Sequence, residues 1–119
     1  MIAIAMLMLA AAPASANPLE GEWIVDLSTN PAQPYVKPMT LHLAPDGTVS
    51  GSFYESTILA GRWKSDRGRT CASFRTTDGA GPYHSAVCAT ANGASGQTWA
   101  EHRNFLFNWN AKRKSAAIE

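Results

Sequence analysis

Apolar and polar residues alternate along short segments of the chain, and turn-forming residues separate these segments. In residues 22–27, for example, Trp23, Val25 and Leu27 share one face. Alternation with a period of two is typical of half-buried β-strands, and no segment shows the longer period of an amphipathic helix. The other alternating segments are 39–43, 48–55, 58–65, 70–76, 83–89, 95–101 and 105–111. The pattern therefore predicts eight strands.

Short links join most of these strands, which favours an antiparallel meander. The exception is residues 28–38, where three prolines indicate an irregular connection. Eight sequential strands hide their edges most simply by closing on themselves. Gly51 and Gly61, inside two of the strands, suit the bends of a small barrel. The predicted fold class is all-β, an eight-stranded antiparallel up-and-down β-barrel.

One hairpin contains both cysteines of the chain. If its turn is centred on residues 79–80, Cys71 lies directly opposite Cys88. Opposed residues on antiparallel strands have Cβ atoms about 4.5–5.5 Å apart, close to the spacing a disulfide needs. The register therefore predicts a Cys71–Cys88 disulfide, as two cysteines in an oxidising compartment usually form.

The same register assigns the two faces of the hairpin. Phe74, Tyr83 and Ser85 point into the barrel, whereas Arg75 and His84 point outward. A catalytic histidine needs a nucleophile or substrate within reach, and usually an orienting partner, whereas His84 is predicted to point outward and the chain has no nucleophile motif such as G-x-S-x-G. We therefore expect no enzymatic activity. Two cysteines and three dispersed histidines make a poor metal site, so no metal and no cofactor are expected.

The ends of the chain differ from its centre. Residues 1–16 are apolar and uncharged and end in Ala-Ser-Ala, which predicts a signal peptide cut before Asn17. This run is too short for a membrane anchor, which needs about 20 residues. Residues 17–110 form one predicted barrel domain, and residues 111–119 a flexible tail. The expected location is exported, periplasmic or secreted. A formal net charge of +1 favours neither nucleic acid nor a membrane surface as partner.

Several motifs resemble a known family. "GEWIVDL" is similar to the G-x-W opening of the calycin barrels, the group that includes lipocalins and avidins. "DGTVSGSFYES", "LAGRW", "YHSAV" and "GQTW" resemble avidin and streptavidin strands in the same order. The resemblance covers most of residues 21–109. It implies the barrel fold and, by analogy, association into a homo-oligomer.

The resemblance also implies parts of a ligand pocket. Trp99 matches a tryptophan that walls the biotin pocket, and Phe74 stands where another tryptophan would be. Phe53 stands near the pocket tyrosine, and Ser85 matches the serine that binds the carboxylate tail of the ligand. The apolar walls of the pocket are thus partly retained.

The polar end of the biotin pocket is not retained. Val25 and about Thr29 replace the residues that hold the ureido oxygen, Val87 replaces a threonine, and Glu55 displaces a serine. Each hydrogen bond lost in a buried site costs about 1–3 kcal/mol. We therefore expect no high-affinity binding of biotin.

Inward-facing aromatic and polar residues form the candidate ligand site. The candidate ligand-binding residues are Trp23, Phe53, Glu55, Trp63, Phe74, Tyr83, Ser85, Trp99 and Trp109. Two alternatives stay open. The rings, with Phe105 and Phe107, either line a cavity or fill the barrel, and Glu55 either receives a ligand group or is solvated at the end of its strand.

The predicted function is that of an exported binding protein. It would hold a small hydrophobic or aromatic ligand at the barrel mouth without a cofactor. The alternative is a protein-interaction module, such as a secreted protease inhibitor, with residues 28–38 as its contact.

Overall fold

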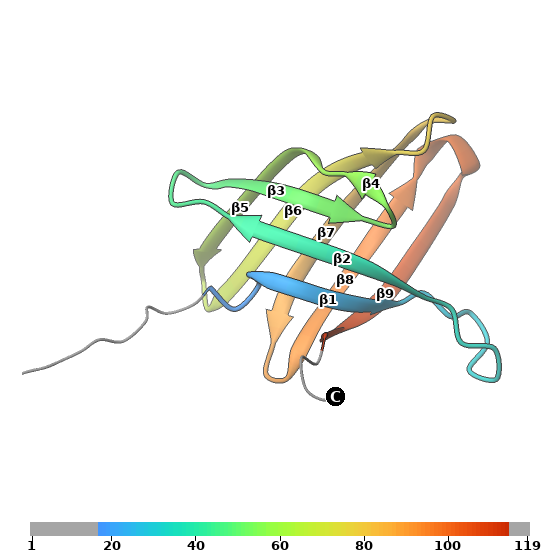
Figure 1. Ribbon diagram of the computed structural model, residues 1–119, viewed down its shortest axis with the longest axis horizontal. Helices are drawn as coiled ribbons and strands as arrows, with labels where there is room; N and C mark the ends of the chain where they lie inside the picture. The colour runs from blue at the N-terminus through green and yellow to red at the C-terminus, as the bar shows by residue number, and fades with distance from the viewer. Residues whose placement is uncertain (1–16, 115–119) are drawn as a thin grey trace, which may run out of the picture.

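The computed structural model describes residues 17–114, which form an all-β, closed antiparallel barrel (Figure 1). The strands are β1 (Gly21–Asp26), β2 (Val36–Leu43), β3 (Thr48–Phe53), β4 (Ser56–Thr57), β5 (Leu59–Asp66), β6 (Arg69–Thr77), β7 (Pro82–Thr90), β8 (Gly93–Ala100) and β9 (Phe105–Arg113). The helix η1 (Glu101–Arg103) is a single 3₁₀ turn. The signal peptide predicted for residues 1–16 lies outside the described residues.

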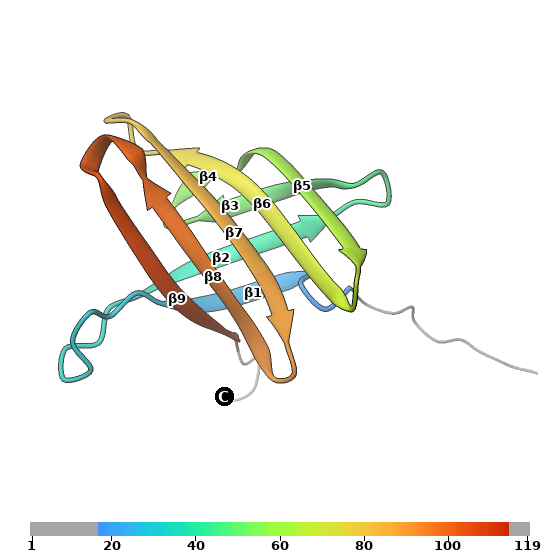
Figure 2. The same ribbon diagram turned by 180° about the vertical axis from the view of Figure 1, so that it is seen from behind.

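Pairing between β2 and β3 closes the sheet into a barrel. The strand order is β2-β1-β9-β8-β7-β6-β5-β3-β4, and each of these pairs is antiparallel. In Figure 1, β1, β2 and β3 form the front wall and β6 to β9 cross behind them as the other; Figure 2 shows the same two walls from behind, with β6 to β9 in front. The predicted eight-stranded barrel is confirmed, with the two-residue strand β4 added at its edge.

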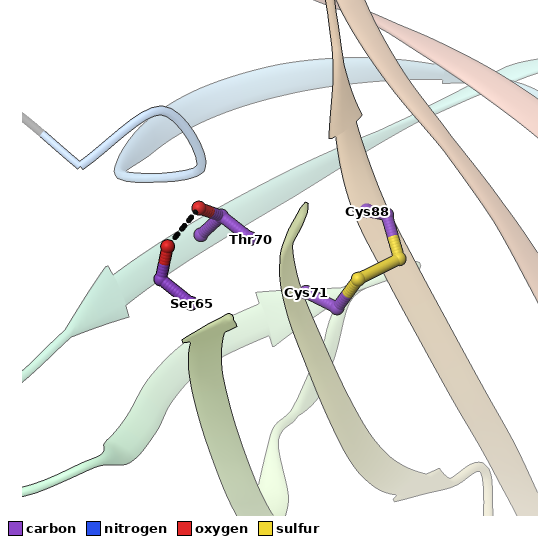
Figure 3. The surroundings of a disulfide bond; sticks show 4 residues. All are labelled: Ser65, Thr70, Cys71 and Cys88. Carbon is purple, nitrogen blue, oxygen red and sulfur yellow. Dashed lines mark hydrogen bonds between the residues drawn. A yellow bond between two sulfur atoms is a disulfide. The ribbon is translucent and has the colours of Figure 1, made fainter. Parts of the chain in front are cut away.

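The hairpin of β6 and β7 has the predicted register. Cys71 pairs with Cys88, Phe74 with Ser85, and the two cysteines form a disulfide with a Cα–Cα distance of 4.0 Å. Figure 3 shows this bond between the two strands. Beside it, the hydroxyls of Ser65 and Thr70 lie 2.8 Å apart and link β5 to β6. The disulfide prediction is confirmed.

Removing the disulfide is expected to lower the free energy of unfolding by about 3 kcal/mol, because the bond restricts an unfolded loop of this length. The double variant Cys71→Ser/Cys88→Ser avoids an unpaired thiol and is compared with the oxidised protein by urea denaturation. Reduction of the wild-type protein should reproduce the loss. Equal unfolding midpoints for all three samples would contradict this contribution.

A turn ahead of β1 closes one end of the barrel, which we call the closed end. The side chain of Leu19 is fully buried there. The backbone carbonyl of Leu19 accepts a hydrogen bond from Nε1 of Trp23 at 3.0 Å. The guanidinium of Arg113 lies 4.5 Å from the Trp23 ring and donates to the carbonyls of Pro18 and Glu20.

Strand β9 continues to Arg113. The expectation of a flexible tail from residue 111 is wrong for 111–113, because Ala111 is buried in β9.

Glu20 ties this closing turn to β2. Its Oε1 accepts the backbone N–H of Leu43 at 2.8 Å, and its Oε2 lies 3.0 Å from Nδ1 of His42. The hydrogen bond from Leu43 and then that with His42 hold the pKa of Glu20 below its ordinary value. A carboxyl with a lowered pKa stabilises the fold above its unfolded-state pKa, and this stabilisation is lost as pH falls through its folded-state pKa.

Stability is therefore expected to decline as the pH falls below about 4.5, the ordinary pKa of a glutamate. Urea unfolding of the wild-type protein and of Glu20→Gln across this range measures the share of Glu20. The amide still accepts from Leu43 but does not titrate, so the decline should be shallower in the variant. Identical pH profiles would show that Glu20 contributes nothing to the acid sensitivity.

The connection from β3 to β5 differs from the alternation expected of it. Tyr54 and Glu55 have φ angles of 56° and 68°, so the chain turns at Phe53 and places Glu55 in an exposed position. Its expected inward orientation is wrong, and the alternative of a solvated strand end holds. A bulge after Leu59 then turns Ile58 into the core and leaves Leu59 exposed.

Candidate ligand-binding site

The barrel has a hollow at the end opposite the closing turn, which we call the open end. Strands β1, β3, β6 and β8 finish there, and the loops that follow them surround a cavity of about 130 Å³. The residues that line this cavity are Leu27, Phe53, Tyr54, Ser56, Thr76, Asp78, Tyr83, Thr98, Arg103 and Phe107.

The floor of the cavity is buried and mixed in character. Leu27 and Phe53 supply apolar surface, and Thr76 and Thr98 are equally buried. The Phe53 ring lies 5.4 Å from the ring of Trp109, which packs in the core beneath it. Aromatic and aliphatic walls with a few polar groups are typical of small-molecule sites.

A short network of hydroxyl groups supports this floor. Nε1 of Trp109 donates to Oγ1 of Thr98 at 2.9 Å, and the hydroxyls of Thr98 and Ser85 lie 2.8 Å apart. All three side chains are buried. Inside a barrel such bonds avoid the cost of an unpaired polar group, so the network fixes the orientation of Thr98.

Aromatic side chains surround the mouth of the cavity. A second, open hollow of about 470 Å³ adjoins it and shares three of its residues. This hollow is lined by Tyr35, Tyr54, Arg103, Phe105 and Phe107. The rings of Phe105 and Phe107 lie 4.6 Å apart, edge to face. On the other side, Nζ of Lys37 lies 4.9 Å from the Tyr54 ring.

Polar groups hold the β6–β7 loop beside the cavity. The hydroxyl of Tyr83 donates to Oδ2 of Asp78 at 2.8 Å, and the N–H of Ala80 donates to Oδ1 at 3.0 Å. The bond from Ala80 and then that from Tyr83 hold the pKa of Asp78 below its ordinary value. Nη1 of Arg103 lies 3.4 Å from the Tyr83 hydroxyl and donates a long hydrogen bond to it.

Four of the predicted ligand-binding residues contribute to the site. Phe53 and Tyr83 line the cavity. Ser85 and Trp109 lie behind Thr98 and support it. Phe74 is buried and packs edge to face against Phe53, with centroids 5.9 Å apart, so it belongs to the core under the site.

Four other predicted site residues lie elsewhere. Trp99 is 38% exposed on the outer face, opposite Leu106, because Thr98 takes the inward position on β8. Trp23 packs at the closed end, as does Trp63, whose Nε1 donates to the carbonyl of Ala44 in the β2–β3 turn. Glu55 is in the exposed turn described above. The prediction that these four line a site at the mouth is wrong.

His84 points outward, as the register predicts. Its Nε2 lies 3.1 Å from Oε1 of Glu101 on the surface of the barrel. Within residues 17–114, no three His, Cys, Asp or Glu side chains are placed to hold a metal ion. No helix in this part of the chain is long and apolar enough to cross a membrane.

Two classes of site residue were missed from the sequence. Thr76 and Thr98 were missed because a threonine in a strand carries no signal of its own. Pairing Ser85 with Thr98 across β7 and β8 would have placed Thr98 inside. Asp78 lies in the β6–β7 loop and Arg103 in the single turn of η1, and strand alternation makes no prediction for either.

Comparison with known proteins found no significant match among protein-family models, curated protein sequences or solved structures. The resemblance to avidins stays a prediction from the motifs.

Proposed function

We propose that this protein is a non-enzymatic binding protein that holds a small aromatic or apolar ligand at the open end of its barrel. The observation that supports this most is the cavity there, whose buried floor combines the apolar side chains of Leu27 and Phe53 with two threonines. A concave, mainly apolar site with a few convergent polar groups is the usual form of a ligand pocket.

The size of the cavity limits what can enter it. Pockets that enclose drug-sized ligands have volumes of about 300 Å³ or more. A cavity of about 130 Å³ is closer to the engineered cavity of about 150 Å³ that binds benzene in another protein. A group the size of one ring therefore fits inside, and the remainder of a larger ligand would lie in the open hollow.

Biotin is not the expected ligand. At two positions where avidins would supply polar contacts, this chain has Val25 and Val87, and both are buried in the core. We propose an avidin-like barrel whose ligand differs from biotin. The Cys71–Cys88 disulfide supports the further proposal that the protein is exported, because such bonds persist mainly in oxidising compartments.

Native mass spectrometry of the protein purified from its own host tests the proposed function. The expected result is a bound small molecule that is lost in Ser56→Trp, because Ser56 lines the cavity and a large ring there would fill it. Thr57→Trp is the matched control, since Thr57 is exposed on the same short strand. Absence of any bound molecule, with no response to a panel of hydrophobic ligands that includes biotin, would contradict the proposal.

A protein-interaction module, such as a secreted protease inhibitor, is the second candidate. Large apolar side chains are exposed in and beside the β1–β2 connection, where Tyr35 and Val36 are 44% and 50% exposed. In Figure 1 this connection projects away from the barrel. Inhibition of a secreted protease that is lost when both residues are replaced by serine would favour this candidate.

A further inference from the structure

Arg103 lies where the enclosed cavity and the open hollow meet, and it lines both. Its nearest hydrogen-bond partner is the Tyr83 hydroxyl at 3.4 Å. Among the ion pairs of residues 17–114, none involves Arg103. Most of its donors are therefore available to a ligand. A guanidinium is the side chain best shaped to bind a carboxylate through two parallel hydrogen bonds.

In the described part of the chain, the acidic groups near the mouth form no ion pair with Arg103. Asp78 is the one carboxylate that lines the cavity, and its two oxygens accept hydrogen bonds from Ala80 and Tyr83 within its own loop. Glu55 is exposed and lines neither hollow. Lys37 adds a positive charge beside the Tyr54 ring, although it too lines neither hollow. The neutral donors leave Asp78 its negative charge, so the preference for an anion rests on the unused hydrogen-bond donors of Arg103 at the mouth.

The floor offers a hydrogen-bond donor of its own. Thr98, Ser85 and Trp109 carry three polar hydrogens between them but make two mutual hydrogen bonds, so one hydroxyl hydrogen remains. Ser85 does not line the cavity, and an unpaired hydroxyl there would be costly. Either hydroxyl can be the donor in the Ser85–Thr98 bond; with Ser85 as the donor, the remaining hydrogen is that of Thr98, which lines the cavity.

We infer that the ligand of this site is a single-ring aromatic carboxylate. Its ring lies in the cavity between Phe53 and Phe107, and its carboxylate binds Arg103 at the mouth. The ring is the group that fits the enclosed volume, and the aromatic walls suit its faces. A polar substituent opposite the carboxylate would reach the hydroxyl of Thr98. This inference rests on the proposed function and adds the chemical class of the ligand.

Four probes of similar size test the inferred class of ligand: benzoate, 4-hydroxybenzoate, benzylamine and toluene. Their dissociation constants for the oxidised protein are measured by ligand-detected NMR. Benzoate is expected to bind at least about tenfold more tightly than benzylamine or toluene, because one charge-assisted contact is worth about that factor. 4-Hydroxybenzoate is expected to bind more tightly than benzoate.

Two pairs of variants assign the contacts. Arg103→Gln should remove the preference for benzoate over toluene, whereas Arg69→Gln, at an exposed position by the closed end, should keep it. Thr98→Val should remove the advantage of 4-hydroxybenzoate, and Thr98→Ser, which retains the hydroxyl, should restore it. Circular dichroism of each variant establishes that the barrel is still folded.

Each unfavourable outcome has a distinct meaning. Preference for benzylamine would overturn the inference and point to Asp78 as the recognition group. Equal binding of toluene and benzoate would also overturn it, while leaving an apolar ligand site as proposed. No saturable binding of any probe would overturn the inference, and with no bound molecule in native mass spectrometry it would overturn the proposed function as well.

Discussion

Replacing Trp109 by alanine is expected to lower the free energy of unfolding by about 3–5 kcal/mol, the usual cost of truncating a buried tryptophan. Trp109 is 3% exposed, packs against Phe53 and donates to Thr98. The variant leaves a cavity beneath the site and removes the donor that orients the Thr98 hydroxyl. Urea denaturation measures the loss, and ligand binding should fall with it.

Trp99 is the matched control for this substitution. It lies on the neighbouring strand but faces outward, where its cross-strand neighbours are His84 and Leu106. Trp99→Ala should therefore cost no more than about 1 kcal/mol. Similar losses for the two variants would contradict the orientation of β8. A larger loss for Trp99 would restore the pocket role that the avidin resemblance implies for it.

Gly51→Ala is expected to destabilise the barrel by about 2–6 kcal/mol, because steric overlap and backbone strain add at this position. Gly51 has a φ of 129°, and an added Cβ would lie 2.0 Å from the carbonyl oxygen of Thr40. These two residues belong to β3 and β2, the strands whose pairing closes the sheet. The variant therefore tests barrel closure directly.

Gly68→Ala separates the cost of backbone strain from the cost of steric overlap. Gly68 also has a positive φ, of 77°, but an added Cβ would meet no atom within 4 Å. The expected loss is about 1–2 kcal/mol, the cost of a left-handed conformation alone. Unfolding midpoints of both variants are compared with that of the wild-type protein. If Gly51→Ala costs no more than Gly68→Ala, β2 and β3 are not packed as closely as described.

The strands and the disulfide could be predicted because both follow from simple periodicities. Alternation identifies which residues of β1, β6 and β7 face the core, and the register of one hairpin brings Cys71 and Cys88 together. These features depend on neighbours in sequence or on one short turn. The same reasoning correctly places His84 on the outer face.

Alternation failed where the backbone leaves the regular strand geometry. Tyr54, Glu55 and Ala60 adopt positive φ angles although none is glycine, so nothing in the sequence signals the turn and the bulge. The closed end depends on hydrogen bonds from Arg113 to Pro18 and Glu20, which are far from it in sequence and meet it only when the barrel closes.

The candidate site was predicted less well than the fold, because it is built largely from loops and small polar residues. Arg103 comes from η1 and Asp78 from the β6–β7 loop. On β8 the large residue, Trp99, faces outward and the small residue, Thr98, faces the cavity. Placing the largest apolar residues inside therefore predicts the wrong orientation for β8.

Chemical-shift mapping of the ¹⁵N-labelled protein during titration with benzoate tests binding at the open end most directly. The predicted result is saturable shifts of the amide signals of Thr76, Thr98 and Phe107, which line the cavity, with those of Trp63 and Arg69 at the other end unchanged. Saturable shifts centred on the closed end or on the outer face, or no saturable shift with benzoate or any other single-ring ligand, would contradict a ligand site at the open end.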